Sequence, residues 1–370
     1  MRKLAWTAWA LAMLAVAPDL SARESSRAKE VPVRNVIYMI GDGMGLTHVS
    51  MMMLEEGYRP TSFDRSQNVA LITTYSANNR VTDSAAAGTA LASGRKTNNG
   101  MLGMTPDGET FESMMEKAMD EGWKAGLVVT VYLQHATPAA FYAHVPSRND
   151  LDEISEQFVE SGVDVAFGGG RKFLAADRGD GKTLIDELKA KDYRVVYDLQ
   201  EADAVDRGRI VGLFSEEYMP TVLNGRDENY LCDATKKALE ILTNNAGRKG
   251  GFLLMVEGSQ IDSEAHANNA QGILAETRDF DRAVGAAMDY ADAHPGTLVV
   301  VTADHETSGL SITSNDFTLS DSGVGYHFGT TGHSGTMVPV YLYGTGAERI
   351  NGVMDNTELS KKIQSLMGLE

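Results

Sequence analysis

Three stretches of the sequence are unbroken apolar runs, rich in β-branched residues: VIYMI at 36–40, FLLMV at 252–256 and TLVVV at 297–301. Such runs are typical of strands buried on both faces, as in a mostly parallel sheet. Weaker patterns of the same kind bring the expected strands to eight. They are 33–40, 69–75, 125–131, 163–167, 194–197, 252–256, 298–302 and 337–343.

Helical patterns lie between many of these strands. They cover 46–56, 84–93, 110–120, 151–160, 233–244 and a long segment within 264–293. This alternation predicts a doubly wound α/β fold, with a mostly parallel central sheet flanked by helices on both faces. No internal repeat or low-complexity linker divides the chain, so we expect one catalytic domain over residues 23–370.

Residues of the kind that bind metals follow four of the predicted strands, where each strand ends. They are Asp42; His135 and Thr137; Glu257 and Asp262; and Asp304 and His305. Ligands of open α/β sheets bind beyond the carboxyl ends of the strands. Four strands that each carry such groups at the same end therefore predict one shared site.

Three sets of residues suit zinc, each with an ordinary alternative. Asp304 and His305, in the run Asp304-His305-Glu306, are adjacent at a strand end, where neighbouring side chains can converge on one ion. A polar turn would look the same. Asp262 and His266 are four residues apart, so on a helix they would lie on one side and could bind one ion. The alternative is that both simply belong to a solvent-exposed helix face. His333 lies in a long Gly-, Ser- and Thr-rich stretch, where such loops are often functional, although a lone loop histidine often has no role.

Ser84 is the candidate nucleophile. Thr82 or Asp83 can cap a helix there, and residues 85–92 favour it, so Ser84 would lie in the first turn, where free N–H groups attract phosphate. A capping serine on an ordinary buried helix is the alternative. Arg148 offers a planar fork for two phosphate oxygens, although most such arginines are simply on the surface.

Several other motifs carry no function that we predict. DRGDGKT at 177–183 has Ala176 where a phosphate loop needs its leading glycine, and GDGMGL has Leu46 where a dinucleotide motif needs its last glycine. The remaining histidines show no ligand spacing; they are His48, His144, His294 and His327. The single cysteine, Cys232, excludes an intrachain disulfide and a cysteine-based zinc cluster, and we expect it to be buried.

The N-terminus is positively charged, continues with an apolar run over 4–17 and ends in small residues. This pattern predicts a secretory signal peptide over 1–22, cleaved after Ala17 or Ala22. The run of about 14 residues is shorter than the roughly 20 that a membrane span needs. We therefore expect a periplasmic or secreted bacterial protein, with no membrane association after cleavage.

The chain is acidic, with 33 Lys and Arg against 51 Asp and Glu, a formal charge of −18. This balance argues against a protein that coats nucleic acid, which needs a basic surface. It would also repel an anionic substrate, unless metal ions reverse the local field.

Taken together, these motifs resemble those of alkaline phosphatases. The matching segments are YMIGDGMG, TDSAAAGTALASG, HATPAAFYAHVPSR, DVAFGGGRKF, MVEGSQIDSEAH, VTADHE and GHSGTMVPVY, in the order of that family and from about residue 33 to 343. The resemblance implies a broadly tolerant phosphate monoester hydrolase that releases inorganic phosphate and an alcohol. It also implies two zinc ions and one magnesium ion per site, and possibly a homodimer.

The resemblance also implies a role for each candidate residue. Ser84 would form a phosphoserine, and Arg148 would clamp the phosphate. The first zinc would be held by Asp262, His266 and His333, and the second by Asp42, Asp304, His305 and the Ser84 oxygen. Magnesium would be held by Asp42, Thr137 and Glu257, with His135 where relatives have Asp or His.

Two features depart from the family pattern. Ser263 stands where many relatives have Trp, His or Lys, so phosphate affinity and release are expected to differ. The chain is also short, so large peripheral insertions are expected to be absent or reduced.

Three alternative functions are compatible with parts of this pattern. A phosphodiesterase of the same superfamily usually has a threonine nucleophile and lacks an Arg148-type clamp. A sulfatase needs a C/S-x-P-x-R-type motif, which DSAAAG lacks. A non-catalytic metal- or phosphate-binding protein would not need Ser84.

Overall fold

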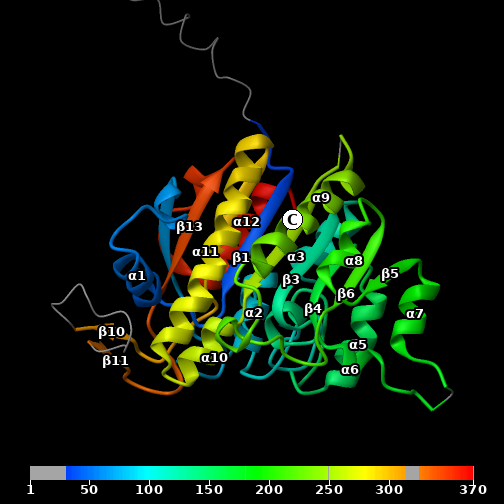
Figure 1. Ribbon diagram of the computed structural model, residues 1–370, viewed down its shortest axis with the longest axis horizontal. Helices are drawn as coiled ribbons and strands as arrows, with labels where there is room; N and C mark the ends of the chain where they lie inside the picture. The colour runs from blue at the N-terminus through cyan, green and yellow to red at the C-terminus, as the bar shows by residue number, and fades with distance from the viewer. Residues whose placement is uncertain (1–30, 180, 249, 314–324, 370) are drawn as a thin grey trace, which may run out of the picture. The chain divides into compact units, whose positions relative to one another are not determined.

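The computed structural model describes residues 31–179, 181–248, 250–313 and 325–369. The predicted signal segment 1–22 lies outside the described residues. The described residues from 32 onwards form one compact unit around a ten-stranded sheet. Figure 1 shows its strands framed by helices.

The sheet is parallel except for one strand. In spatial order it contains β14 (Gly352–Asp355), β2 (Asn68–Thr73), β13 (Val338–Gly344), β8 (Thr297–Thr302), β1 (Asn35–Gly41), β7 (Phe252–Gly258), β3 (Lys124–Tyr132), β4 (Val165–Gly169), β6 (Arg209–Leu213) and β5 (Tyr193–Val196). Only β13 runs antiparallel to its neighbours, β2 and β8. The predicted fold class is therefore confirmed.

The apolar runs form the centre of this sheet. β1, β7 and β8 lie side by side, and apart from Asn35, which is half-buried, all their residues are buried. Their registers align Asn35 with both Phe252 and Thr297, so the three strands start at the same level. Because both faces of these strands are covered, apolar residues do not alternate with polar ones, and the sequences are continuously apolar.

Helices cover both faces of the sheet. α11 (Ala270–Ala293) and α9 (Tyr230–Ala246) cross its near face in Figure 1, whereas α12 (Asn356–Met367) packs on α2 (Ser84–Ser93) behind it. The other helices are α1 (Leu46–Glu55), α3 (Met114–Asp120), α4 (Ala136–Ala139), α5 (Leu151–Glu160), α6 (Arg171–Leu174), α7 (Leu184–Ala190), α8 (Leu199–Asp203) and α10 (Gln260–His266). No helix in the described ranges is long and apolar enough to cross a bilayer.

One predicted helix starts later than expected, and another is confirmed. The helix expected over 110–120 begins only at Met114, because Ser113 caps it: its hydroxyl accepts from the Glu116 N–H, and its own N–H donates to the Glu116 carboxylate. The long helix predicted within 264–293 is confirmed as α11, which follows the short helix α10. The chain turns between them at Asn268, which has a positive φ of 51°.

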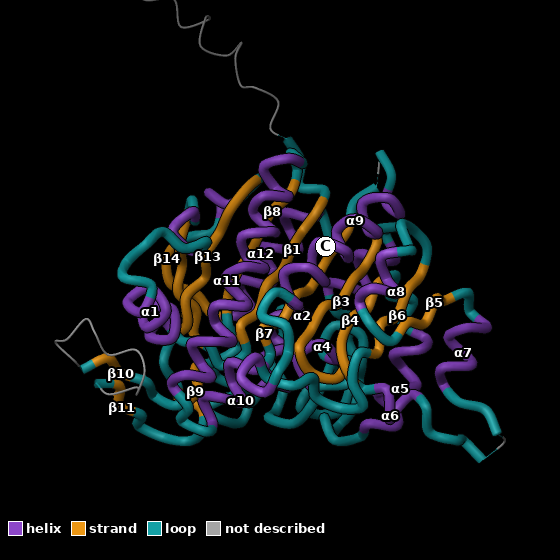
Figure 2. The backbone as a smooth tube through the Cα atoms, in the orientation of Figure 1, coloured by secondary structure: helices purple, strands orange, loops and turns teal. Residues whose placement is uncertain are grey.

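The loops that follow the central strands gather at one edge of the sheet, near α10 and β9 (Glu306–Thr307), as Figure 2 shows. A short strand, β12 (His333–Ser334), pairs with β9 and aligns His333 with Thr307. The stretch expected to lack clear elements therefore contains short paired strands, which bring His333 back to the ends of the central strands.

Candidate active site

The four strands that were predicted to carry ligands are neighbours in the sheet, in the order β8-β1-β7-β3. Asp42 follows β1, Asp304 follows β8, Glu257 lies near the end of β7, and His135 follows β3. Because these strands are parallel, their carboxyl ends meet at the same edge. All four side chains are buried there.

The structure brings every predicted ligand into three groups. Within each group, one possible ligand atom per residue lies within 4.8 Å of the others: Asp262, His266 and His333; Asp42, Asp304 and His305; and Asp42, His135 and Glu257. Thr137 joins the third group, since its hydroxyl lies 3.4 Å from Asp42 Oδ2 and donates to it. Asp42 belongs to two groups and so links them.

The first group contains two histidines whose tautomers are fixed. Nδ1 of His266 lies 2.6 Å from the Thr331 carbonyl oxygen, and Nδ1 of His333 lies 2.8 Å from that of Thr82. A carbonyl oxygen only accepts, so each Nδ1 carries the hydrogen and each neutral ring has its lone pair on Nε2. The two Nε2 atoms lie 3.2 Å apart.

Asp262 completes this group, with its Oδ2 3.3 Å from His266 Nε2 and its Oδ1 3.8 Å from His333 Nε2. Two nitrogen lone pairs and a carboxylate that converge in this way match the ligand set of a zinc ion. Without a bound cation, the hydrogen bond to Asp262 raises the pKa of His266 to about 9.

The second group lies beside Ser84. His305 Nε2 is 3.3 Å from Ser84 Oγ, 3.1 Å from Asp304 Oδ2 and 3.4 Å from Asp42 Oδ1. The Thr307 hydroxyl donates to Asp262, so it can only accept from His305 Nδ1, 3.2 Å away. His305 therefore also presents a lone pair on Nε2, and a carboxylate, an imidazole and a serine hydroxyl meet at one point.

The third group is buried and acidic. Burial, together with the nearby charges of Asp304 and Asp262, raises the pKa of Asp42 well above its ordinary value. Burial also raises the pKa of Glu257 to about 8, with a further contribution from Asp304. Burial and the neighbouring Arg148 lower the pKa of His135 to about 3.

Several buried atoms of these groups have no hydrogen-bond partner among the described residues. They are Asp42 Oδ1, both carboxylate oxygens of Glu257, Asp304 Oδ2 and His135 Nδ1. A buried ionised carboxylate without a partner costs several kcal/mol. Divalent cations would remove this cost, and carboxylate oxygens with imidazole are ligands that zinc and magnesium accept. The residues present therefore fit a cluster of metal ions.

The sequence around Ser84 explains its position at the start of α2. The Asp83 carboxylate caps the helix by accepting from the Ala86 N–H at 3.0 Å, and Gly94 ends it in the left-handed conformation. Small side chains let α2 approach α4 closely: a Cβ added to Gly88 would lie 3.2 Å from that of Ala140. Ser84 is buried with its hydroxyl directed at the second group.

Arg148 lies beside Asp83, the residue before Ser84. One guanidinium nitrogen is 3.6 Å from the Asp83 carboxylate, and the other is 3.1 Å from His135 Nε2. The main chain is fixed as well, since the Arg148 N–H donates to the Gly100 carbonyl at 2.7 Å. A cation is therefore held beside the serine and the helix N-terminus, which suits a bound phosphate.

Two further residues organise the site, although sequence reasoning assigned no role to either. Glu306 is buried and accepts hydrogen bonds from the Gly309 N–H at 2.8 Å and from the Ser334 hydroxyl. Thr307 contacts both His305 and Asp262. Only the sequence position of Glu306 in VTADHE, next to a predicted ligand, could have drawn attention to it.

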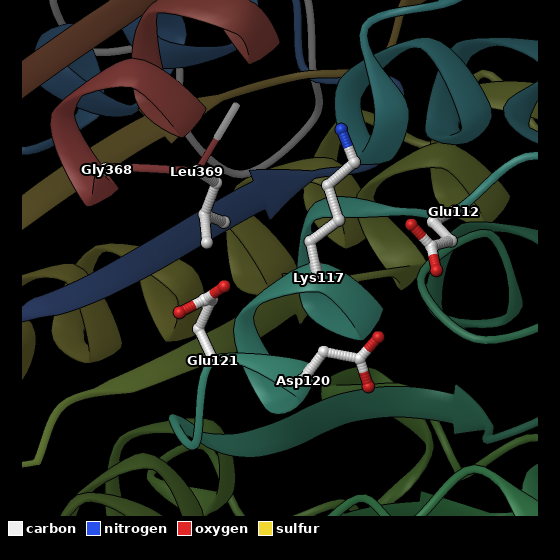
Figure 3. A pocket seen from close by; sticks show the side chains of 6 residues that line it. All are labelled: Glu112, Lys117, Asp120, Glu121, Gly368 and Leu369. Carbon is white, nitrogen blue, oxygen red and sulfur yellow. The ribbon is translucent and has the colours of Figure 1, made fainter.

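Three of the residues set aside in the sequence have ordinary structural contacts, whereas the buried His48 has no hydrogen-bond partner at Nε2 among the described residues. His144 bonds the Gly103 carbonyl and Glu116, His294 stacks on Tyr290, and Cys232 is buried as expected. A hollow of about 410 Å³ lies between α3 and the end of α12 (Figure 3). Its lining contains no histidine and shares no residue with the site.

The matches to known proteins agree with this geometry. The family model for alkaline phosphatase matches residues 33–321. The chain belongs to the alkaline phosphatase family. It is therefore a metal-dependent phosphate monoester hydrolase.

Three relatives align over nearly the whole of this chain. Streptomycin-6-phosphate phosphatase of Streptomyces griseus is 35% identical, over 97% of this chain and 96% of its own length. Alkaline phosphatase 3 of Bacillus subtilis is 32% identical, over 94% of this chain and 91% of its own length. The alkaline phosphatase of Escherichia coli is 30% identical, over 95% of this chain and 90% of its own length.

Solved structures share the same fold. The alkaline phosphatase of the Antarctic bacterium TAB5 superposes with a TM-score of 0.85 at 35% identity, over 92% of this chain and 100% of its own. A variant of that enzyme, with a histidine replaced by glutamate, has Mg bound in its M3 site.

Proposed function

We propose that this alkaline phosphatase works through a phosphoserine on Ser84, with two zinc ions and one magnesium ion. The first zinc is held by Asp262, His266 and His333, and the second by Asp42, Asp304, His305 and the Ser84 oxygen. Magnesium is held by Asp42, Thr137 and Glu257 together with His135.

One observation supports this assignment above the others. The lone pairs of three histidines and the unpaired oxygens of buried carboxylates converge around a serine at the start of a helix. When bound, the metal ions supply positive charge that stabilises the attacking and leaving oxygens of phosphoryl transfer. The Mg in the M3 site of the TAB5 variant supports a third metal of this kind.

The proposed reaction consists of two successive displacements at phosphorus. Ser84 Oγ attacks phosphorus, the bond to the ester oxygen breaks, and the alcohol leaves with the serine proton. A water molecule then attacks the phosphoserine, giving its hydroxyl to phosphorus and its other hydrogen to Ser84 Oγ, and inorganic phosphate is released. Two in-line displacements retain the configuration at phosphorus overall.

Arg148 and the N-terminus of α2 orient the phosphate during both steps. The guanidinium fork can bind two non-bridging oxygens, and first-turn N–H groups favour the negative charge. A diester has only one free negative charge, so this arrangement favours monoesters. Hydrolysis of p-nitrophenyl phosphate should therefore exceed that of bis-p-nitrophenyl phosphate by orders of magnitude.

Replacement of Ser84 tests the mechanism. Ser84→Ala should lower the turnover of p-nitrophenyl phosphate at alkaline pH by about 10³-fold or more, with the metal content unchanged. Ser93→Ala, at the other end of the same helix, is the matched control and should keep full turnover. Near-full turnover of Ser84→Ala would contradict a phosphoserine intermediate.

We also propose broad tolerance of the leaving alcohol. A relative named for streptomycin 6-phosphate, beside relatives named only as alkaline phosphatases, supports a site that does not select strongly among alcohols. A panel of aryl, sugar and glycerol phosphates should give kcat/KM values within about tenfold of one another. A single strongly preferred ester would contradict this proposal.

The N-terminal segment and the compartment belong to the same proposal. Residues 1–22 act as a cleaved signal peptide, 23–370 form the catalytic domain, and the mature enzyme is periplasmic or secreted, with no nucleic-acid partner. N-terminal sequencing of the exported protein would test the cleavage. Light scattering of the mature protein would test for a homodimer.

A further inference from the structure

A cluster of three aromatic rings lies beside the active site, and the proposed mechanism does not use it. The Tyr132 ring packs against Phe173, with centroids 5.2 Å apart, and against Tyr218 at 5.1 Å. The His135 ring contacts both tyrosines, at 5.2 Å and 5.9 Å. Because His135 Nε2 lies 3.1 Å from Arg148, these three rings, the aromatic wall, begin one side chain away from the guanidinium.

The aromatic wall is not part of the hydrophobic core. Tyr218 is 45% exposed, and Tyr132 and Phe173 are half-buried. None of the three belongs to the core cluster that the described residues form. Burial in the core therefore does not explain why three aromatic side chains gather here, and part of the wall is open to solvent.

The turn that carries Tyr218 is held firmly on the side of α6. Arg171 Nε donates to the Glu216 carboxylate at 2.8 Å, and Lys172 forms an ion pair with Glu217. The main chain is joined as well, since the Lys172 N–H donates to the Glu216 carbonyl at 3.1 Å. An exposed aromatic side chain is thus presented on a turn with a defined position.

The same turn is also attached to α10. Gln260 is buried at the start of that helix, and its Nε2 donates to the Met219 carbonyl at 2.7 Å and to the Pro220 carbonyl at 3.2 Å. Asp262 and His266 of the first metal-ligand group lie on α10. The wall is therefore connected to Arg148 through His135, and to the first group through Gln260.

These two connections place the wall where the alcohol part of a substrate would lie. An in-line displacement puts the leaving oxygen opposite Ser84 Oγ, and in the proposed assignment Ser84 belongs to the second group. The leaving oxygen then lies on the side of the first group. The carboxylates beneath it are buried, so the carbon part of the ester must extend along the exposed rim, which includes Tyr218.

We propose that the aromatic wall binds the alcohol part of the substrate and favours phosphate monoesters of aromatic alcohols. Aromatic rings prefer edge-to-face or offset contacts with one another, which an aliphatic group cannot reproduce. The inference rests on the proposed function and adds a substrate class to it. An aromatic contact is worth about two- to tenfold in binding, so the preference stays within a broad tolerance of alcohols.

Two matched esters test the preference. Benzyl phosphate and cyclohexylmethyl phosphate both carry a six-membered ring on a primary alcohol, and the two alcohols have similar acidity. The fully metal-loaded enzyme should hydrolyse benzyl phosphate with a kcat/KM about two- to tenfold higher. Equal values for the two esters would overturn the inference and leave the proposed function intact.

Substitutions of Tyr218 test the residue itself. Tyr218→Leu keeps an apolar side chain but removes the ring, and it should bring the ratio of the two kcat/KM values close to one. Tyr218→Phe keeps the ring and should keep the ratio. Tyr197→Leu changes a tyrosine that is 40% exposed and lies outside the wall, so it should also keep the ratio. An unchanged ratio in Tyr218→Leu would overturn the inference.

Inhibition by inorganic phosphate separates this role from an indirect effect on Arg148. Phosphate has no alcohol part, so its inhibition constant should change by less than about twofold in Tyr218→Leu. Weaker inhibition that accounts for the whole loss of kcat/KM with benzyl phosphate would overturn the inference. Failure of the wild-type enzyme to hydrolyse either ester would instead contradict the proposed function.

Discussion

Two regions of the enzyme bury carboxylates, and they compensate the negative charge differently. Beside α11, the side chain of Arg226 is 3% exposed and pairs with Glu276 and with Asp279 of that helix, the latter at 2.9 Å. In the active site, Asp42 and Glu257 are fully buried, and oxygens of both lack hydrogen-bond partners among the described residues. One region contains its own cation, whereas we propose that the other takes its cations from solution.

The pKa values of the buried carboxyl groups differ between the two regions in the same way. Burial raises the pKa of Asp279 to about 6, although Arg226 opposes the shift. Burial raises the pKa of Glu257 to about 8, and the neighbouring Asp304 adds to it. The comparison supports the proposal that part of the chain's acidity serves metal binding. On that proposal, the net charge of −18 does not describe the field that a phosphate meets.

Removal of the metals should give the largest effect. A chelator should lower turnover by about 10³-fold or more, since bound metals supply several kcal/mol of transition-state stabilisation. It should also lower the melting temperature, because the carboxylates lose their counter-charges. The Arg226 region needs no metal and should keep its hydrogen-exchange protection in the chelated protein.

This loss of stability should depend on pH. The pKa of Glu257 is about 8 in the folded metal-free protein, against an ordinary value of 4.5. Below pH 4.5 the group is protonated in both states and has no effect; as pH rises towards 8, only the unfolded state ionises freely and stability falls. Melting curves of chelated protein at pH 5 and 8.5 would check this, and a higher melting temperature at pH 8.5 would contradict it.

Arg226→Met should have the next largest effect, destabilising the fold by about 3–5 kcal/mol, because two buried carboxylates lose their counter-charge. Urea unfolding of the metal-loaded enzyme measures it. Adding Glu276→Gln and Asp279→Asn to the same variant should recover most of the loss. A cost below about 1 kcal/mol would show that this region does not depend on its internal cation.

Glu257→Gln should stabilise the metal-free protein but weaken the binding of metal. The neutral amide removes a buried charge, so the metal-free variant should be more stable than the metal-free wild type at pH 8.5 by about 2 kcal/mol. With metals present, the variant should bind Mg²⁺ at least about tenfold more weakly. Equal destabilisation in both conditions would indicate a packing role instead.

The sequence predicted the central sheet well because its strands are apolar on both faces, and it predicted that their ends would meet. It did not predict β6, β14 or α12, which lie near the sheet edges, where the patterns are short and mixed. His333 was a candidate, but its place beside His266 depends on the pairing of β12 with β9, which joins segments that are far apart in sequence. The roles of Glu306 and Thr307 depend on the same pairing, so no local pattern reveals them.

The smallest effect should come from carboxylates that are not buried. Arg65 pairs with Asp289 at 2.8 Å and with Asp292 at 3.0 Å on the surface, where both aspartates are more than half exposed. Water already stabilises these charges, so Arg65→Ala should cost less than about 1 kcal/mol, and the cost should shrink further at high salt. Urea unfolding at low and high salt measures both quantities. A cost close to that of Arg226→Met would mean that burial is not what makes a carboxylate depend on a neighbouring cation.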